Sequence, residues 1–428
     1  MKKNLVAFAV AAAMMAPVVA FAADADGSND ANTGPILYGY AQITGAQQFG
    51  TNGPEGLIFG AHRIRLGVKG TAVPGVTYNF QYKWDGAYMS GGSLAGASGI
   101  FKGVNGNSGV QDAEINFGFI PALQLKVGKF RVPVGMERTQ YSGNNLWFIQ
   151  RSMNQSLGAD RSAGAMFHSS DVMNTGIYYS LGVFDNHSLD GNNAFTLFGN
   201  GNPTGVANVG VPFGGVPNGG VNGSALSANG QTDVGGVLSN GTGKYLFAGM
   251  IGYKLNPLLN IELSGARADT LYSGVIPGST YLAANQIDAW NVGARGGLMG
   301  LKYMAEYSHV TSYQGVGGLN ANDWYVALAA NLHQMTLTPS WLDIEPAVRF
   351  ERFDWNYNGN HAYLNNTTIG LNYSVDPSNP YAARVQLNYV IPTQGSAFRA
   401  AYTRGDFGFV PTNGYIYNTL ALQFQAGF

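Results

Sequence analysis

One stretch of this chain concentrates cationic side chains that could bind anions. Together with Arg131, which directly precedes it, the segment 132–161 carries four arginines and only two acids, Glu137 and Asp160. The guanidinium of arginine is planar, permanently charged and able to bind oxyanions through two parallel hydrogen bonds. A group of such side chains favours anions in a pore. The candidate solute-binding residues are therefore Arg131, Arg138, Arg151 and Arg161.

These arginines could instead hold the segment in shape by pairing with carboxylates nearby or elsewhere in the chain. We expect this structural role for Arg131 and Arg138, because both lie close to Glu137 in the sequence. We expect Arg151 and Arg161 to face the lumen, since strand alternation would turn the one acid beside Arg161 to the opposite face. The same segment contains Trp147-Phe148, which we expect to pack against apolar protein rather than to stack on a ligand.

Motifs for other chemistry are missing from the sequence. The six histidines form no H-E-x-x-H pair, and the chain has no G-x-S-x-G sequence, no P-loop and no cysteine. We therefore predict no metal site, no cofactor and no catalytic residues. An outer-membrane enzyme remains an alternative, because a fold can bring a histidine beside a serine or an acid that lies far away in the sequence.

The elements that would position the arginines are strands of about ten residues in which apolar and polar side chains alternate. In the clearest, Val76–Asp85, five apolar residues share one face and Thr77, Asn79, Gln81, Lys83 and Asp85 share the other. We count sixteen such segments. They are 36–49, 56–71, 76–85, 110–120, 123–131, 162–170, 174–184, 244–254, 259–268, 286–296, 300–310, 322–332, 342–355, 363–374, 380–391 and 415–428.

Alternation fails in only one of these segments, around Arg352 and Phe353, where we expect a β-bulge. The connections between segments alternate between short turns, such as Pro121-Ala122, and long stretches rich in Gly, Asn and Ser. The long connections are 86–109, 132–161, 185–243, 269–285 and 392–414. Short periplasmic turns, long external loops and an even strand number are typical of bacterial outer-membrane barrels.

The first 22 residues have the features of a cleaved secretory signal: Lys2 and Lys3, an apolar run, and an A-x-A site ending at Ala22. We expect a short N-terminal segment at 23–35 and a single barrel domain at 36–428. Export of a barrel through a signal peptide predicts that the protein lies in the bacterial outer membrane, in contact with outer-membrane lipid and lipopolysaccharide.

The composition excludes several classes of protein. Charged residues make up 11% of the chain, whereas soluble domains carry about a quarter, and no apolar run beyond the signal is long enough for a transmembrane helix. The 23 basic residues fall to 21 when Lys2 and Lys3 are removed with the signal, against 24 acidic ones. This negative balance argues against nucleic-acid binding. A soluble β-sandwich would carry more charge on its outer face.

Strand alternation also predicts which wall residues point into the barrel. Charge facing lipid costs roughly 2–4 kcal/mol for Lys or Arg at the membrane midplane, so charged strand positions are expected inside. The predicted inward cations are Arg63, Arg65, Lys83, Lys126, Lys302, Arg349 and Arg384. The predicted inward acids are Asp85, Asp112, Glu114, Glu262 and Glu306. The lumen wall should thus carry charges of both signs.

The chain ends in LALQFQAGF, an alternating strand whose last residue, Phe428, shares a face with Leu420, Leu422 and Phe424. A terminal aromatic on a lipid-facing strand resembles the assembly signal of outer-membrane barrels. We therefore expect Phe428 to act in assembly.

Several stretches resemble the phosphate-selective porin O and P family. They are LKVGKFRVPVGMER (125–138), LGADRSAGAMFH (157–168), YYSLGVFDN (178–186), AVRFERFDWN (347–356) and TIGLNYSVDPSNPYAARVQLNYV (368–390). The resemblance implies a sixteen-stranded, homotrimeric barrel whose lumen attracts anions, and in which the third external loop folds inward to form a constriction. By our count segment 132–161 is that loop. This sequence departs from the family pattern in having few lysines and several inward acids.

The sequence therefore predicts an all-β, transmembrane antiparallel barrel that acts as a passive diffusion channel for small hydrophilic solutes, with a weak to moderate preference for anions, phosphate among them. Two alternatives remain: a structural or docking barrel plugged by the connection 185–243, and an outer-membrane enzyme.

Overall fold

The computed structural model describes the barrel and part of its connections. The described residues are 34–50, 56–85, 107–159, 161–185, 245–269, 284–313, 317–339, 341–357, 359–398, 411 and 413–428. The predicted signal peptide, Asp160 and most of the long connections other than 132–161 lie outside these ranges.

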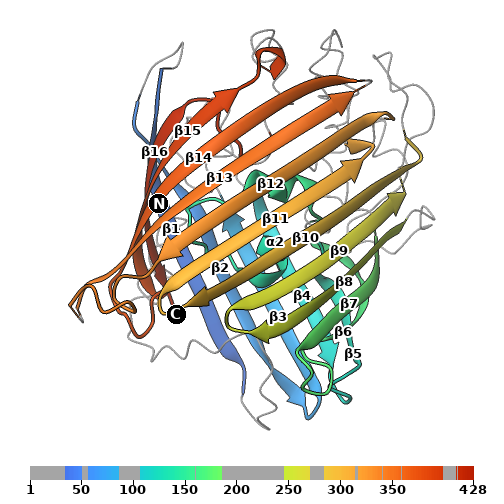
Figure 1. Cartoon of the computed structure of the whole chain (residues 1–428). Coiled ribbons are helices and arrows are strands. Elements are labelled where there is room, and N and C mark those ends of the chain that lie inside the picture. The colour runs from blue at the N-terminus through green and yellow to red at the C-terminus, as the bar shows by residue number, and fades with distance from the viewer. Residues whose placement is uncertain are drawn as a thin grey trace, which may run out of the picture.

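Sixteen antiparallel strands close into one barrel, in which each strand pairs with the next along the chain and β1 pairs with β16 (Figure 1). The strands are β1 (Ile36–Phe49), β2 (Ile58–Val73), β3 (Val76–Asp85), β4 (Asn107–Phe117), β5 (Gln124–Arg131), β6 (Arg161–Ser169), β7 (Ile177–Asp185), β8 (Tyr245–Asn256), β9 (Leu259–Asp269), β10 (Gln286–Leu298), β11 (Leu301–Thr311), β12 (Leu319–Ala330), β13 (Asp343–Tyr357), β14 (Asn360–Ser374), β15 (Ala383–Gln394) and β16 (Asn418–Gly427). All sixteen predicted strands are confirmed, with ends shifted by a few residues.

The alternation seen in the sequence becomes an apolar outside and a largely polar inside. On β16, Leu420, Leu422 and Phe424 are exposed on the outer face, whereas Gln423 between them is fully buried. The outer face of β3 likewise exposes Phe80 and Tyr82. In the part of the chain that the structure describes, no helix is long and apolar enough to span a membrane.

The predicted bulge at Arg352 and Phe353 is wrong, because β13 pairs with β12 and β14 without a register shift. Side chains still alternate between the inner and outer faces there, but the polar and apolar residues have exchanged faces. Phe353 is buried inside the barrel, while Arg352 pairs with Asp354 on the outer face. The connections are also less regular than predicted, since β13 ends at Tyr357 and β14 begins at Asn360.

Two bulges that the sequence analysis missed change the lumen. In β2 the register shifts at His62, and in β4 it shifts at Gln111. A bulge adds one residue to one strand and can turn the neighbouring side chains to the same face. As a result His62 with Arg63, and Gln111 with Asp112, are consecutive residues whose side chains are buried inside the barrel.

The last residue closes the barrel. The backbone N–H of Gly39 donates to the carbonyl of Phe428 at 3.0 Å, and the N–H of Phe428 donates to the carbonyl of Gly39 at 2.9 Å. These reciprocal bonds extend the pairing of β1 with β16 by one step beyond Gly427.

Candidate functional site: a constriction loop and an arginine cluster

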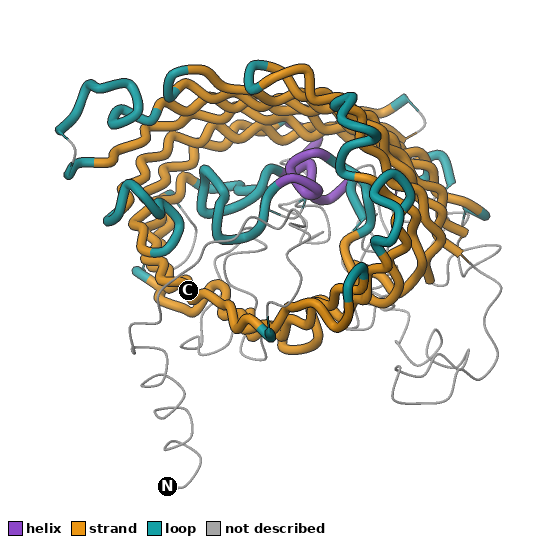
Figure 2. Tube along the Cα trace, turned by 90° about the horizontal axis from the view of Figure 1, so that it is seen from below, coloured by secondary structure: helices purple, strands orange, loops and turns teal. Residues whose placement is uncertain are grey.

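The segment 132–159 lies inside the barrel, as predicted for the third external loop (Figure 2). We call it the constriction loop. It contains the short helix α2 (Met136–Gln140) and the 3-10 helix η1 (Met153–Leu157). Its entry depends on Gly128 of β5, which has a φ of 116° and where a Cβ atom would overlap the carbonyl of Ala113. The pairing of β4 with β5 stops at Lys129, and β5 leaves the wall after Arg131, where its pairing with β6 ends.

Three wall arginines hold the loop by donating to its backbone carbonyls. Arg384 donates to Leu146 at 2.6 Å, Arg63 to Ile149 at 3.3 Å, and Arg349 to Gln150 at 3.1 Å. These residues, which we call the anchor arginines, are 2 to 8% exposed. All three point inward as predicted. The loop covers them, so they line the wall surface that the loop contacts and not the open lumen.

Wall carboxylates accept further hydrogen bonds from the loop. Glu306 accepts the N–H of Glu137, and Glu351 accepts the N–H of Met153 at 2.7 Å. Glu262 accepts bonds from the side chains of Thr139 and Gln140, each at 3.0 Å. The wall thus fixes the loop through both donors and acceptors, and on β13 Arg349 and Glu351 supply one of each.

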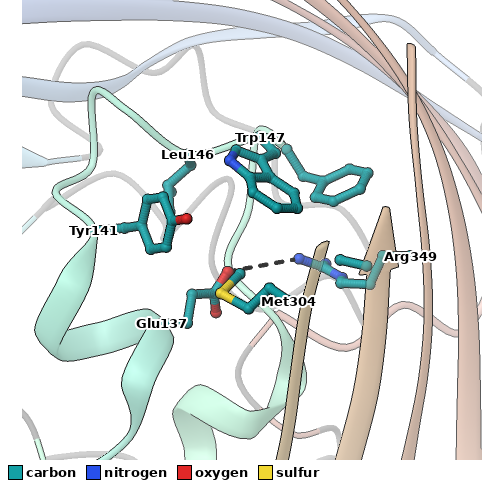
Figure 3. A pocket seen from close by; sticks show the side chains of 8 residues that line it. Glu137, Tyr141, Leu146, Trp147, Met304 and Arg349 are labelled. Atoms are coloured by element: carbon teal, nitrogen blue, oxygen red, sulfur yellow. Dashed lines mark ion pairs between the residues drawn. The ribbon is translucent and has the colours of Figure 1, made fainter. Parts of the chain in front are cut away.

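Apolar packing fills the space between these contacts. Trp147 and Phe148 are 5% and 3% exposed and form a cluster with Met304 and Ala327 of the wall, which confirms the predicted packing role. A small pocket in this region lies between the loop and the wall (Figure 3). There Glu137 faces Arg349 with 3.9 Å between the carboxylate and the guanidinium, and Arg349 also lies 4.8 Å from the centre of the Phe148 ring.

Three of the four predicted arginines bind carbonyls of the loop itself. Arg131 donates to the carbonyls of Arg138 and Tyr141, and Arg151 donates to those of Glu137 and Tyr141. Arg138 donates to two carbonyls near the end of the loop. The expected pairing of Arg131 and Arg138 with Glu137 is wrong: that carboxylate accepts from Ser152 and faces Arg349 instead.

The expectation that Arg161 lacks an acidic partner is also wrong. Its Nε lies 2.6 Å from the Oδ1 of Asp112 on β4, two strands away across the wall. The bulge at Gln111 helps to place this carboxylate in the lumen. A partner from a distant strand is not visible in the local sequence, which is why the prediction failed.

Four arginines nevertheless gather on the β2–β6 side of the loop. Arg131 interacts electrostatically with Arg151 and Arg161, and Arg151 interacts also with Arg65. Lys83 pairs in register with Arg65. We call Arg65, Arg131, Arg151 and Arg161 the arginine cluster. Arg65, Arg131 and Arg161 are partly exposed and present positive charge to the lumen. The expectation that Arg151 faces the lumen is wrong, because it is 8% exposed and its guanidinium donates to two loop carbonyls.

The other predicted wall cations pair with acids. Lys126 lies 3.3 Å from Glu114, and Lys302 lies 2.6 Å from Glu345. Within the described residues, no group of three or more His, Asp or Glu side chains could hold a metal ion. The prediction that the wall carries both signs of charge is confirmed, and the arginine cluster is its most positive part.

Comparisons with known proteins agree with this architecture. Residues 35–205 match the model of the family described as phosphate-selective porin O and P, which confirms the resemblance found in the sequence. The search of curated proteins found no match.

Solved structures show the same fold at low sequence identity. An anion-selective porin from Comamonas acidovorans is 13% identical, with a TM-score of 0.56, and the match covers 92% of this chain and 99% of that one. OprB of Pseudomonas putida is 12% identical, with a TM-score of 0.56, over 92% and 94% of the two chains. OmpT of Vibrio cholerae, in its trimer form, is 11% identical, with a TM-score of 0.53, over 93% and 100%.

Proposed function

We propose that this chain forms a passive outer-membrane pore for small hydrophilic solutes and that it favours anions to a weak or moderate degree. The observation that carries the proposal is the position of the arginine cluster, beside a loop that crosses the lumen of a porin barrel. The family match over residues 35–205 and the neighbouring anion-selective porin support it.

Charge at the constriction outweighs charge on the wider wall, because the interaction between charges strengthens at short distance and where little water screens it. The cluster has four guanidinium groups, with Asp112 as the acid paired to one of them. A guanidinium can donate two parallel hydrogen bonds to an oxyanion, so phosphate is one candidate among the permeant anions.

Selectivity tests this proposal directly. Replacing Arg151 and Arg161 together by Ala removes two positive charges and leaves Asp112 without its guanidinium partner. The zero-current potential in a salt gradient should then move toward cation preference. A matched control is the pair Arg267 and Arg352, each of which bonds to an acid on the outer face. An unchanged potential in the first variant would show that the loop arginines are structural only.

The rival function is a structural or docking barrel plugged by the connection 185–243, which lies outside the described residues apart from Asp185. Purified protein in planar bilayers separates the two: stepwise single-channel conductance supports the pore, and a barrel without it supports the plug.

We also propose export through a cleaved signal peptide at 1–22 and assembly as a homotrimer surrounded by outer-membrane lipid and lipopolysaccharide. The trimer form of the OmpT structure supports the oligomeric state. Unheated protein should migrate as an SDS-resistant oligomer and become a monomer after boiling. Migration as a monomer before heating would contradict this.

Phe428 is proposed to act in assembly. Deleting it removes one ring, worth about 1.5–3 kcal/mol of burial, together with the reciprocal bonds to Gly39. If the residue is part of the insertion signal, the amount of protein in the outer membrane should fall more than the stability of the barrel that does assemble. Normal amounts after deletion would show that the aromatic ending is coincidental.

A further inference from the structure

A second group of cations lies on the β10–β15 side of the constriction loop and adjoins the arginine cluster through the loop backbone, where Arg131 and Arg151 donate to the carbonyl of Tyr141. It combines Arg295 of β10, Lys302 of β11 and Arg384 of β15 with two phenol rings, Tyr141 of the loop and Tyr381 of the turn before β15. We call these five residues the tyrosine–cation group.

The members of this group lie close together although they come from separate elements. The guanidinium carbon of Arg295 is 5.3 Å from the centre of the Tyr141 ring, and that of Arg384 is 5.4 Å from the centre of the Tyr381 ring. Lys302 interacts electrostatically with both tyrosines. Each ring therefore lies beside an arginine, and Lys302 lies near enough to both rings to interact with them.

The group carries more positive than negative charge. Its three cations are accompanied by Glu345, whose Oε2 lies 2.6 Å from the Nζ of Lys302. The side chain of Lys302 remains 25% exposed despite this pair. Both tyrosines and Arg295 are also partly exposed, so both rings and two of the three cations can be reached from the lumen. The third cation, Arg384, is buried under the loop, where it contacts the Tyr381 ring.

The aromatic surface distinguishes this group from the arginine cluster. The ring nearest to Arg65 is Tyr40, which is only 8% exposed. In the tyrosine–cation group the partly exposed ring of Tyr141 packs edge to face on the buried Trp147, with 6.0 Å between ring centres (Figure 3). A rigid ring beside a cation can bind a molecule that has both an apolar face and a negative end.

We propose that the tyrosine–cation group is a second solute site, which binds carboxylates attached to an aromatic ring. The carboxylate bonds to Lys302 and Arg295, and the ring of the solute lies against Tyr381 and Tyr141. This inference rests on the proposed pore function, because the solute reaches the group through the lumen. It assigns to the pore a class of organic anion that the arginine cluster alone does not distinguish from inorganic ones.

The test compares two carboxylates of similar size and equal charge as blockers of chloride current through single pores in planar bilayers. Benzoate has the aromatic ring and cyclohexanecarboxylate lacks it. An aromatic pair adds enough free energy that benzoate should block at a concentration about threefold to tenfold lower. Equal block by the two compounds would overturn the proposal.

Variants then locate the site. Tyr381→Leu should remove most of the difference between the two compounds, and Lys302→Gln should weaken block by both. Lys126→Gln is the matched control, because Lys126 also pairs with a wall carboxylate but lies on the opposite side of the lumen. If the leucine variant fails to assemble, Tyr381→Phe, which keeps the ring, and Lys302→Gln carry the test. Benzoate preference that survives in Tyr381→Leu, or that is lost equally in Lys126→Gln, would overturn the assignment.

The two proposals fail in different ways. A pore that conducts but does not favour chloride over potassium contradicts the anion preference assigned to the arginine cluster. A pore that favours chloride yet does not distinguish benzoate from cyclohexanecarboxylate contradicts only the second site.

Discussion

The anchor arginines and the arginine cluster contain the same type of side chain within one barrel, and their surroundings give them different roles. Arg63, Arg349 and Arg384 point from the wall into backbone carbonyls of the constriction loop and are almost completely buried. Arg65, Arg131 and Arg161 remain partly exposed beside the loop. Only the second set can present its charge to a solute.

The difference shows that an inward arginine is not by itself evidence for a solute site. Burial, not bonding to carbonyls, separates the two sets: Arg131 also donates to loop carbonyls but stays partly exposed, whereas the charge of Arg349 reaches the lumen only through covering protein. The wall acids differ in the same way, since Glu351 is fully buried beside Arg349 whereas Asp112 lies among the arginines of the cluster. Each region can therefore be altered separately.

The largest effect is expected at Arg349. Replacing it with Met leaves Glu351 and Glu137 buried without their guanidinium partner, and breaking a buried pair in this way costs about 3–5 kcal/mol. The temperature at which the barrel dissociates or unfolds should fall clearly. Arg352→Met is the control, because that residue lies on the same strand but pairs with Asp354 on the outer face, where little change is expected. Equal losses in the two variants would contradict the anchoring role.

A smaller, electrical effect is expected at Asp112. The Asp112→Asn change removes the acid from the arginine cluster while leaving the guanidinium of Arg161 in place. The zero-current potential should shift toward stronger anion preference, opposite to the shift expected for loss of Arg161. Glu351→Gln provides the comparison, because its carboxylate is buried beneath the loop and should change stability more than selectivity. An identical potential shift in both variants would remove the distinction between the two regions.

The smallest effect is expected from salt. The screening length falls from about 10 Å at 0.1 M salt to about 3 Å at 1 M, so anion preference set by the partly exposed cluster should decline as salt rises. The anchor contacts are buried and should resist the same change, which makes the heat stability of the barrel nearly independent of salt. Permeability ratios measured across this range, with melting measured in parallel, check both expectations.

The sequence predicted the parts of this structure that depend on local pattern. Alternation along each strand reflects which side faces lipid, so all sixteen strands and the inward direction of residues such as Lys302 and Arg384 could be found. The loop position followed from the family resemblance. The partner of Arg161 could not be found, because Asp112 lies 49 positions away and is brought near by strand packing.

The bulges show a second limit of pattern reading. At Arg352 and Phe353 an apolar side chain faces the lumen and a charged one faces outward, so the sequence pattern resembles a bulge although the register is regular. At His62 and Gln111 the extra residue of a true bulge is polar, so the sequence gives no sign of it. Composition therefore misleads in both cases, and only the pairing register separates them. The tyrosine–cation group was missed for a related reason, since its members come from four strands or turns and the loop.

The bulge at His62 also suggests how pores of this kind diverge. Because Ala61 and Ile64 both follow the outer pattern on either side of it, deleting His62 would leave Ala61, Arg63 and Ile64 in regular alternation. A one-residue deletion elsewhere in a strand would turn every later side chain to the wrong face. Insertions and deletions at such positions can therefore exchange pore-lining groups while the lipid-facing surface stays constant, which gives natural selection a route to new permeability without rebuilding the barrel.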